Sequence, residues 1–514
     1  MVIVGGGSAG WLCAGVIAAE HRSLKVTLLE APGIPPIGVG EGTWPTMRDT
    51  LHDMGVSEAD FFRECDASFK QGSLFRDWIH GRGEAHDSYY HPFVLPQGYA
   101  ETNLVAGWLA RHADVPFADL VSFQPHLCAR GRAPKQAATP EFAAVANYGY
   151  HLDAGKFGMF LRKHCTGTLG VRHVQDEVVA IDSHDHGDIA ALRTREHGAI
   201  GGDLFIDCTG MQSLLLGGHF GIPFLSQRHV LFNDSALAVQ VRYPAADSPV
   251  ASQTISTAQR AGWIWDIGLP TRRGVGHVYS SAHTSDAQAE RDLRAYLAAT
   301  GAPLEQLDIP APRKLSFNPG YREKFWHRNC VAIGMSSGFI EPLEASALAL
   351  VELSARLVSE QMPATRAAME PLARRFNDTF RYRWERVIEF LKLHYVLSQR
   401  VDADGDAGYW RDNRDPATIP GRLQELLALW RHQPPSRYDF TRIEEIFPSA
   451  SYQYVLYGMG FRPDARDGLR RFDDAERADQ YFRDAAALTR KMLPALPSNR
   501  ELLDHIRLHG MHKI

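Results

Sequence analysis

The first 30 residues restrict the fold of this chain more strongly than any other segment. Residues 1–4 are apolar, three successive glycines follow them, and the residues at about 11–21 predict a helix. Residues 25–30 are largely apolar and predict a second strand. A strand, a glycine turn, a helix and a strand in this order predict a βαβ unit at the start of a parallel sheet.

Gly5, Gly7 and Gly10 lie between the expected strand and the expected helix with the spacing G-x-G-x-x-G. Because these residues have no Cβ, the backbone amides at the helix start can approach a pyrophosphate closely. Glu30 follows Gly10 by twenty residues, at the end of the second strand, where a carboxylate can bind a ribose diol. The segment therefore predicts a dinucleotide-binding site.

Two later segments favour FAD as the dinucleotide. Residues 203–210, DLFIDCTG, end an apolar strand in Thr-Gly, which is common in two-domain flavoproteins; a plain β-turn is the alternative. Residues 329–355 predict a strand that reaches Gly334 and a helix that begins near Ser346. The first amides of such a helix can bind an anion or the edge of the flavin. Glu341 and Glu344 precede this helix, where a carboxylate either complements the helix dipole or takes part in chemistry.

A third unusual segment is GWIWDIGL, residues 262–269. Its alternation predicts a strand that presents Trp263, Trp265 and Ile267 on one face. Packing in the core of a sheet is the simplest interpretation of such an aromatic row.

The remaining segments complete the expected layout. We expect mixed helix and loop over residues 45–165, a β-meander over 171–207, and largely helical structure after 346. The predicted fold class is α/β, with a Rossmann-like FAD-binding body, an interleaved mixed sheet and a helical C-terminal part. The predicted domains are an FAD-binding body over 1–350 and a helical substrate-binding part over 351–514.

Composition limits the partners of this 514-residue chain. The net charge of −5 and the lack of a basic block argue against nucleic acid and anionic membranes as partners. The six cysteines include no C-x-x-C pair, so we expect no disulfide and no structural zinc, and no third ligand accompanies His184 and His186 in their expected turn. Residues 1–19 lack the basic start of a signal peptide, and we expect a cytoplasmic protein.

Three motifs in order, GGGSAGW, WIWDI and GFIEPLE, resemble those of the flavin-dependent tryptophan halogenases, and the resemblance spans about residues 1–400. It implies a two-component enzyme in which FADH2 and O2 form a flavin hydroperoxide that oxidises chloride or bromide. Hypohalous acid then reaches a buried lysine and halogenates an indole-type aromatic. A separate NAD(P)H-dependent flavin reductase supplies the reduced flavin.

The resemblance also implies roles for individual residues. Lys70 in ASFKQGSLF matches the family's lysine, and Glu344 matches the glutamate that removes the ring proton. The other implied positions are Ser346 and Ala347 for the halide, His91 and Phe93 for the substrate, and Trp263, Trp265 and Ile267 for a barrier beside the flavin. Together, the glycine motif and the resemblance assign FAD binding to Gly5, Gly7, Ser8, Ala9, Gly10, Trp11, Glu30, Gly38, Val178, Gly334 and Leu348.

The sequence departs from the family pattern at two places. It reads Glu344-Ala345-Ser346-Ala347 where the family usually has E-S-T-G, and Gly268 stands where Pro usually follows the strand isoleucine. Because backbone amides would bind the halide, the first change need not remove that site. Gly268 loses the fixed φ of proline at the end of the strand.

Two other functions remain as alternatives at this point. A single-component FAD-dependent aromatic monooxygenase would use the same cofactor, but it gives WIWDI and Lys70 no role. A flavin-binding protein without catalysis would leave Lys70 and Glu344 unexplained. For a halogenase, L-tryptophan and simpler indoles are both open as substrates.

Overall fold

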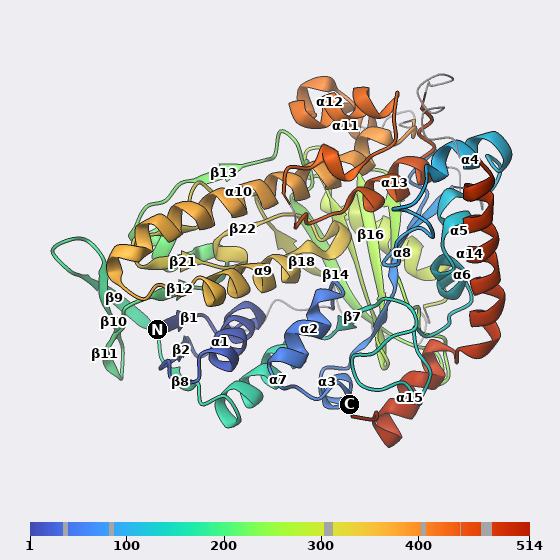
Figure 1. Ribbon diagram of the computed structural model, residues 1–514. Helices are drawn as coiled ribbons and strands as arrows, with labels where there is room; N and C mark the ends of the chain where they lie inside the picture. The colour runs from blue at the N-terminus through green and yellow to red at the C-terminus, as the bar shows by residue number, and fades with distance from the viewer. Residues whose placement is uncertain are drawn as a thin grey trace. The chain divides into compact units, whose positions relative to one another are not determined.

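The computed structural model describes residues 1–33, 40–81, 87–302, 312–401, 408–442, 444–463 and 475–513 (Figure 1). They form two compact units, each assembled from three segments of the chain. Unit 1 comprises Met1–Ala67, Leu152–Arg228 and Phe317–Trp384, and unit 2 comprises Ser68–His151, His229–Ser316 and Glu385–Ile514. The predicted division of function near residue 350 stays a prediction.

Unit 1 is built on the predicted βαβ opening. Its main sheet has six strands, in the order β20 (Trp326–His327), β21 (Cys330–Ala332), β12 (Phe205–Asp207), β1 (Val2–Val4), β2 (Thr27–Glu30) and β8 (Arg172–Gln175). β1 pairs in parallel with both β2 and β12, so the first strand lies inside the sheet. Helix α1 (Ser8–Glu20) contacts α7 (Ala154–Gly167) and α9 (Ser346–Glu360), as Figure 1 shows. The Rossmann-like prediction is confirmed.

The predicted meander divides between two sheets. β8 and β12 join the parallel sheet, whereas the residues between them form a separate antiparallel sheet. The remaining strands and helices of unit 1 are β9 (Val178–Ser183), β10 (Ile189–Thr194), β11 (Gly198–Gly201), β13 (Phe224–Ser226), β19 (Gly320–Arg322), β22 (Gly338–Phe339), β3 (Glu41–Gly42), α2 (Thr46–Asp53) and α3 (Glu58–Glu64). Helix α10 (Arg366–Leu397) begins in unit 1 and ends in unit 2.

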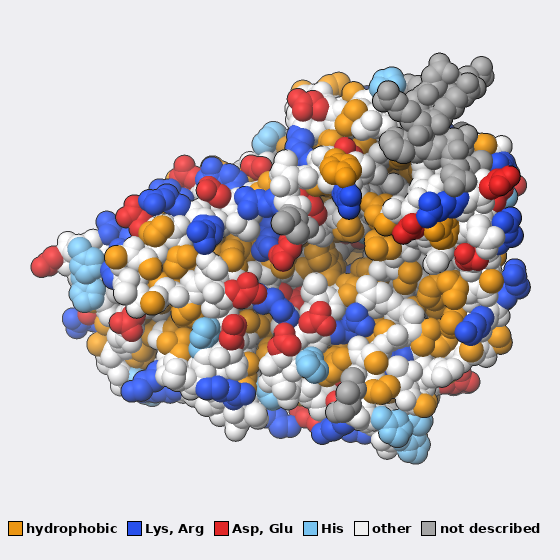
Figure 2. Space-filling view, viewed as in Figure 1, with side chains coloured by type: hydrophobic (Ala, Val, Ile, Leu, Met, Phe, Trp, Pro, Cys, Tyr) orange, Lys and Arg blue, Asp and Glu red, His pale blue; other side chains and the backbone are white. Residues whose placement is uncertain are grey.

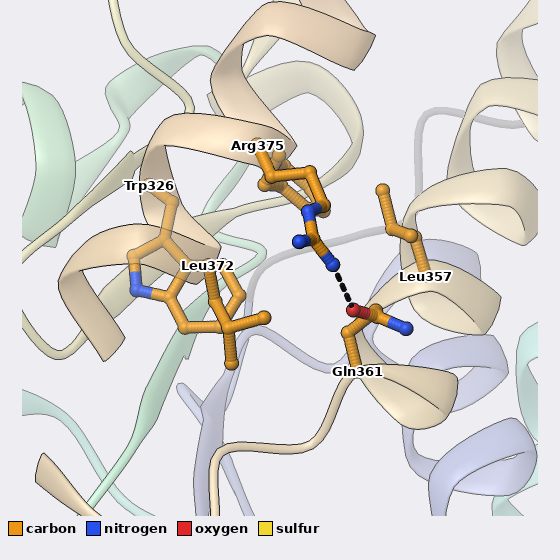
Figure 3. A pocket seen from close by; sticks show the side chains of 6 residues that line it. Trp326, Leu357, Gln361, Leu372 and Arg375 are labelled. Atoms are coloured by element: carbon orange, nitrogen blue, oxygen red, sulfur yellow. Dashed lines mark hydrogen bonds between the residues drawn. The ribbon is translucent and has the colours of Figure 1, made fainter. Parts of the chain in front are cut away.

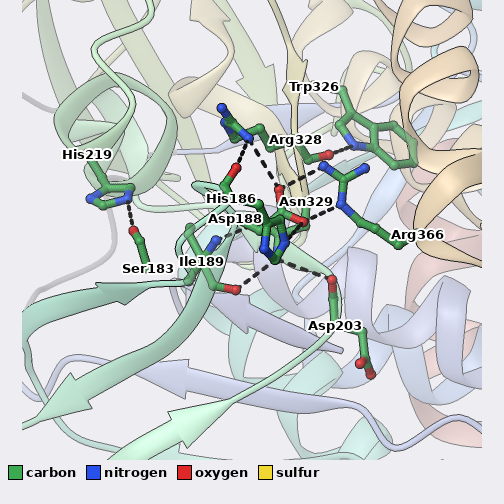
Figure 4. A network of polar contacts seen from close by, with 10 residues as sticks. All are labelled: Ser183, His186, Asp188, Ile189, Asp203, His219, Trp326, Arg328, Asn329 and Arg366. Carbon is green, nitrogen blue, oxygen red and sulfur yellow. Dashed lines mark hydrogen bonds and ion pairs between the residues drawn. The ribbon is translucent and has the colours of Figure 1, made fainter.

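The turn between β9 and β10 is held by a buried carboxylate, Asp188 (Figure 4). Arg366 at the start of α10 donates two hydrogen bonds to it, and His186 Nε2 lies 3.2 Å from its Oδ2. Burial opposes ionisation of Asp188, but the Arg366 hydrogen bonds outweigh it and lower the pKa. The His184 and His186 rings stack 5.1 Å apart in this turn. The two histidines therefore have a structural explanation.

Unit 2 contains a seven-stranded sheet with the tryptophan strand near its centre. The order is β18 (Arg313–Ser316), β14 (Ser235–Arg242), β17 (Arg272–Tyr279), β16 (Gly262–Gly268), β15 (Thr254–Gln259), β5 (Gly72–Arg76) and β6 (Ser88–Pro92). All seven residues of β16 are buried, so the strand is covered on both faces. Ile264 packs with Leu293 and Leu297 of α8 (Asp286–Ala299), on the face opposite to the tryptophans.

The tryptophan face of β16 is packed tightly. The rings of Trp263 and Trp265 lie 6.5 Å apart, and Trp263 also lies 6.4 Å from Trp78. Trp265 faces Gly276 on β17, where a Cβ would come within 2.1 Å of the indole. The strand prediction is confirmed, and Gly276 provides the space that the second indole needs.

The expectation of mixed helix and loop over residues 45–165 is wrong in part. Four strands lie there, namely β5, β6, β4 (Ser68–Lys70) and β7 (Gly149–Leu152). These strands have three to five residues each, so their alternation is too brief to separate them from loops in the sequence.

The helices after residue 346 follow the prediction. Besides α9 and α10 they are α11 (Tyr409–Asn413), α12 (Gly421–Trp430), α13 (Ser449–Gly458), α14 (Ala475–Ala495) and α15 (Asn499–His509). Unit 2 also contains α4 (Leu104–Arg111), α5 (Phe117–Val121) and α6 (Gln124–Ala129). Among the described helices, none has the length and hydropathy needed to cross a membrane.

Charges on the surface are of mixed sign. On the face shown in Figure 2, Lys and Arg side chains alternate with Asp and Glu. All six cysteines are buried free thiols. Within the described ranges, no group of His, Cys, Asp or Glu is arranged to hold a metal ion.

Candidate active site

The glycine turn after β1 has the close contacts that the motif requires. Gly5 has φ 114°, and a Cβ there would lie 2.2 Å from the carbonyl oxygen of Cys208. A Cβ on Gly10 would lie 1.9 Å from the carbonyl oxygen of Gly5. At Gly7, by contrast, nothing lies within 4 Å of the position that a Cβ would take. Gly5 and Gly10 therefore permit the tight turn, and the surface at Gly7 is open to a ligand.

Helix α1 begins at this open surface. Gly7 is its N-cap residue and supplies no side-chain hydrogen bond, so the first amides, at Ser8 and Ala9, have no cap from a side chain. Gly334, at φ 75°, approaches the same helix start, since a Cβ on it would lie 2.8 Å from Ala9 Cβ. Open glycine backbone at an uncapped helix N-terminus suits the pyrophosphate of FAD.

Glu30 lies next to this turn, as the spacing predicts. A Cβ on Gly6 would lie 2.1 Å from the Glu30 carboxyl carbon, and His173 Nε2 lies 2.9 Å from Glu30 Oε2. Trp11 is only 1% exposed and packs edge-on against the His173 ring at 5.0 Å. Val178 is half-buried at the start of β9. The contribution of Trp11 and Val178 to FAD binding stays a prediction, and Gly38 lies outside the described residues.

The segment before α9 has an unusual backbone. Glu344 (φ 62°) and Ala345 (φ 55°) are consecutive non-glycine residues in the left-handed region. The indole Nε1 of Trp44 donates a 2.8 Å hydrogen bond to the carbonyl oxygen of Glu344. Such a conformation costs about 1–3 kcal/mol per residue, and it is found mainly where function or surrounding packing maintains it.

Helix α9 begins directly after this strained pair. No side chain caps its first turn, and Ser346 and Leu348 are buried, whereas Ala347 is exposed. Glu344 itself is 6% exposed. The structure therefore brings Glu344 and the three predicted halide and flavin-edge positions together in unit 1, at an uncapped helix N-terminus that can bind an anion.

A second buried carboxylate, Glu352, lies two turns further along α9. It accepts hydrogen bonds from Thr50 Oγ1 (2.7 Å) and Thr46 Oγ1 (3.4 Å) of α2, and Arg356 donates to Thr50 Oγ1. Burial raises the pKa of Glu352 to about 8. These bonds connect α9 with α2, the helix that follows Trp44, and no motif in the sequence marks these residues as partners.

Replacing Glu352 with glutamine is expected to change how stability depends on pH. Because folding raises the pKa of Glu352, its protonated form contributes to the stability of the fold. This contribution is fully present below about pH 4.5, the ordinary pKa of a glutamate, and it is lost as the pH rises through about 8. Glutamine stays neutral and can still accept from Thr50. The melting temperature of Glu352→Gln should therefore exceed that of the wild type by a margin that grows from pH 6 to pH 9. At the upper end, the gain in unfolding free energy should be on the order of a few kcal/mol.

A parallel pH dependence of the two melting temperatures would contradict this assignment. The half-buried Glu41, whose pKa is raised to about 7 by desolvation, titrates in the same range. Because Glu41 is present in both proteins, the difference between their melting temperatures isolates Glu352.

In unit 2, Lys70 lies at the end of β4 and is 1% exposed. Its Nζ lies 5.4 Å from the centre of the Phe93 ring, within the range of a cation–π interaction. Two residues earlier, Ser68 Oγ donates to the carbonyl oxygen of Gly268, at the end of the tryptophan strand. The structure therefore places the predicted lysine beside one predicted substrate residue, and its strand is bonded to the end of β16.

His91, on β6, lies in an aromatic region. Its Nε2 is 2.9 Å from Ser451 Oγ on α13, and its ring centre is 5.7 Å from that of Phe390 and 6.2 Å from that of Tyr454. Flat aromatic faces of this kind suit an electron-rich ring. Through Ser451 and Tyr454, α13 therefore forms part of the surroundings of His91.

A small pocket in unit 1 lies away from these predicted positions. It is lined by Trp326, Leu357, Gln361, Leu372, Arg375 and Phe376, and Arg375 donates a 2.8 Å hydrogen bond to Gln361 across it (Figure 3). None of the predicted site residues lines it, and it has no acid, base or nucleophile suited to the proposed chemistry.

Fold and glycine turn together define a dinucleotide-binding protein of the Rossmann type. The tryptophan halogenase family model matches residues 1–474. Tryptophan 6-halogenase SttH of Streptomyces toxytricini is 33% identical over 98% of this chain and 97% of its own length, and tryptophan 7-halogenase RebH of Lentzea aerocolonigenes is 32% identical over 98% of each. A tryptophan halogenase structure from Shewanella frigidimarina NCIMB 400 is 50% identical, with a TM-score of 0.93, and the match covers 100% of this chain and 98% of that one.

The chain belongs to the tryptophan halogenase family. It is a flavin-dependent halogenase, an enzyme that uses FADH2, O2 and a halide. This result confirms the resemblance on which the functional prediction was based and argues against the monooxygenase and the non-catalytic alternatives.

Proposed function

We propose that this enzyme transfers an oxidised halogen to an indole-type aromatic through Lys70 and Glu344. The observation that carries the proposal is that Lys70, which matches the family's lysine, is buried in unit 2 beside Phe93, a proposed substrate residue. Bound reduced flavin and O2 supply the oxidising equivalent for the halide. Lys70 then holds the resulting hypohalous acid and directs its halogen toward the aromatic ring.

Glu344 is proposed to remove the proton from the halogenated ring. Its carboxylate is buried, and its backbone is fixed by the Trp44 hydrogen bond, so it can act as a positioned base. The amides of Ser346 and Ala347 are proposed to bind the halide, with Leu348 beside the flavin edge. An uncapped helix start supports this role, because its N–H groups attract anions whatever the side chains are.

The remaining predicted residues shape the site. His91 and Phe93 are proposed to stack on the substrate, and Trp263, Trp265 and Ile267 to separate the substrate from the flavin. The buried packing of β16 supports a fixed barrier. The bond from Ser68 to Gly268 supports a defined strand end where the family usually has proline.

The substrate follows from the family and the site chemistry. The relatives SttH and RebH are named as tryptophan halogenases, and the aromatic surroundings of His91 fit an indole ring. The decisive experiment is mass spectrometry after incubation of L-tryptophan and simple indoles with the enzyme, FAD, a flavin reductase, NADH and chloride or bromide. A halide-dependent mass shift supports the proposal, whereas a hydroxylated product would support a monooxygenase.

A separate flavin reductase is proposed as the partner, in the cytoplasm where NAD(P)H is available. Only one G-x-G-x-x-G follows a strand in the sequence, and it is assigned to FAD. Mixing the enzyme with FAD and NADH or NADPH in air should therefore give no oxidation of the nicotinamide above background. Adding a reductase should start halogenation, and rapid oxidation without it would contradict the two-component scheme.

A further inference from the structure

The strands β4 and β7 place a second base beside Lys70. In their antiparallel register Ser68 lies opposite His151, and Lys70 lies opposite Gly149. Residues two apart on a strand, and residues opposite them on the neighbouring strand, point to the same face. His151 is therefore the diagonal neighbour of Lys70 on that face, and Gly149, directly opposite Lys70, places no side chain there. Lys70 is 1% exposed and His151 is fully buried.

His151 is oriented by one hydrogen bond and has one nitrogen without a partner. Its Nε2 lies 2.8 Å from Thr254 Oγ1 on β15, while its buried Nδ1 makes no hydrogen bond to any described residue. Burial, and then the charge of Lys70, lower the pKa of His151 well below its usual range, so the ring is neutral. His277 also has one buried ring nitrogen without a partner, so the feature that distinguishes His151 is its position diagonal to Lys70.

We propose that His151 is a positioning residue for Lys70, and that it takes the proton that Lys70 sheds when its nitrogen accepts halogen. The inference rests on the role proposed for Lys70. Two bases this close in a buried site carry one positive charge between them, because a second charge would be repelled and poorly solvated. Release of the Lys70 proton removes this repulsion while burial still disfavours the imidazolium, so His151 holds the proton only until the leaving hydroxide takes it.

The proton transfers balance. The ammonium of Lys70 gives one proton to His151 and becomes an amine. Its lone pair forms the N–X bond while the O–X bond of hypohalous acid breaks, and hydroxide leaves. That hydroxide takes the proton from His151 and becomes water, so the imidazole is neutral again and the halogenated nitrogen of Lys70 carries the positive charge. The halogen is oxidised before this step and keeps its oxidation level.

The test separates oxidant formation from oxidant use. His151→Gln keeps an amide near the position of Nε2, facing Thr254, but lacks a basic nitrogen, and His151→Asn is a second variant in case the first folds poorly. With reductase present, both should form hypohalous acid, trapped by a soluble chlorination probe, within about twofold of the wild-type rate. Product should fall roughly 100-fold, the scale expected for loss of a positioned base.

His277 supplies a matched control. It is also a fully buried histidine of unit 2, bonded through Nδ1 to the carbonyl oxygen of Ala289. His277→Gln should keep the wild-type ratio of product to oxidant once corrected for folded protein. Loss of both oxidant and product in the His151 variants, or an equal loss in His277→Gln, would overturn the inference in favour of a structural role.

A parallel Lys70 variant distinguishes this inference from the proposed function. If Lys70→Ala is inactive and the His151 variants make normal product, His151 is not the proton acceptor and the proposed role of Lys70 stands. If Lys70→Ala makes normal product, the proposed function itself fails.

Discussion

Lys70→Ala is expected to abolish halogenation while FAD binding and hypohalous acid formation continue. The physical reason is that the lysine is proposed to act after the flavin step, on an oxidant that has already formed. Loss of product should exceed roughly 100-fold, and the oxidant should instead appear in solution. Product can be measured by mass spectrometry and oxidant by a chlorination probe, with FAD binding followed by fluorescence.

Lys135 provides a stringent control for this experiment. It is also 1% exposed in unit 2, its Nζ lies 5.4 Å from the Tyr148 ring, and it donates a 2.9 Å hydrogen bond to the carbonyl oxygen of Pro140. Lys135→Ala removes a comparable buried ammonium and should lower stability but not the ratio of product to oxidant. Normal product yield from Lys70→Ala would remove Lys70 from the mechanism.

Local features of the fold could be predicted from the sequence. The glycine turn depends on contacts within ten residues and on the ends of the two strands that pair with β1, namely β2 and β12. The glycine spacing specifies the local part of these contacts. Helix α9 begins at Ser346, where the strand-glycine-helix pattern predicts it. The tryptophan strand β16 has strict alternation over seven residues, which is long enough to identify.

Features that depend on distant pairing could not be predicted in the same way. Lys70 is on a three-residue strand, and its neighbour His151 comes from a strand about eighty residues later. No local pattern specifies the register that places these two side chains on one face. Glu352 illustrates the same limit, since its threonine partners on α2 are about 300 residues away in the chain.

Residues 344–347, where the sequence departs from the family pattern, begin with an unusual backbone. Glu344 and Ala345 both adopt left-handed backbone angles without glycine, so the surrounding contacts must maintain them. One such contact is the bond from Trp44 Nε1 to the Glu344 carbonyl oxygen. The backbone that orients the first amides of α9 therefore depends on Trp44 as well as on the side chains of residues 344–347.

Glu344→Gln is expected to lower turnover by roughly two orders of magnitude or more, because glutamine keeps the shape of the side chain but cannot accept the ring proton. The Trp44 bond goes to the backbone of residue 344, so the turn before α9 should persist and the apparent affinity for halide should stay within about twofold. Glu341 is 1% exposed and three residues away, which makes Glu341→Gln the matched control for a buried carboxylate. Turnover measured with saturating indole and a varied halide concentration separates these effects. An unchanged rate in Glu344→Gln, together with a large loss in Glu341→Gln, would assign the base to Glu341 instead.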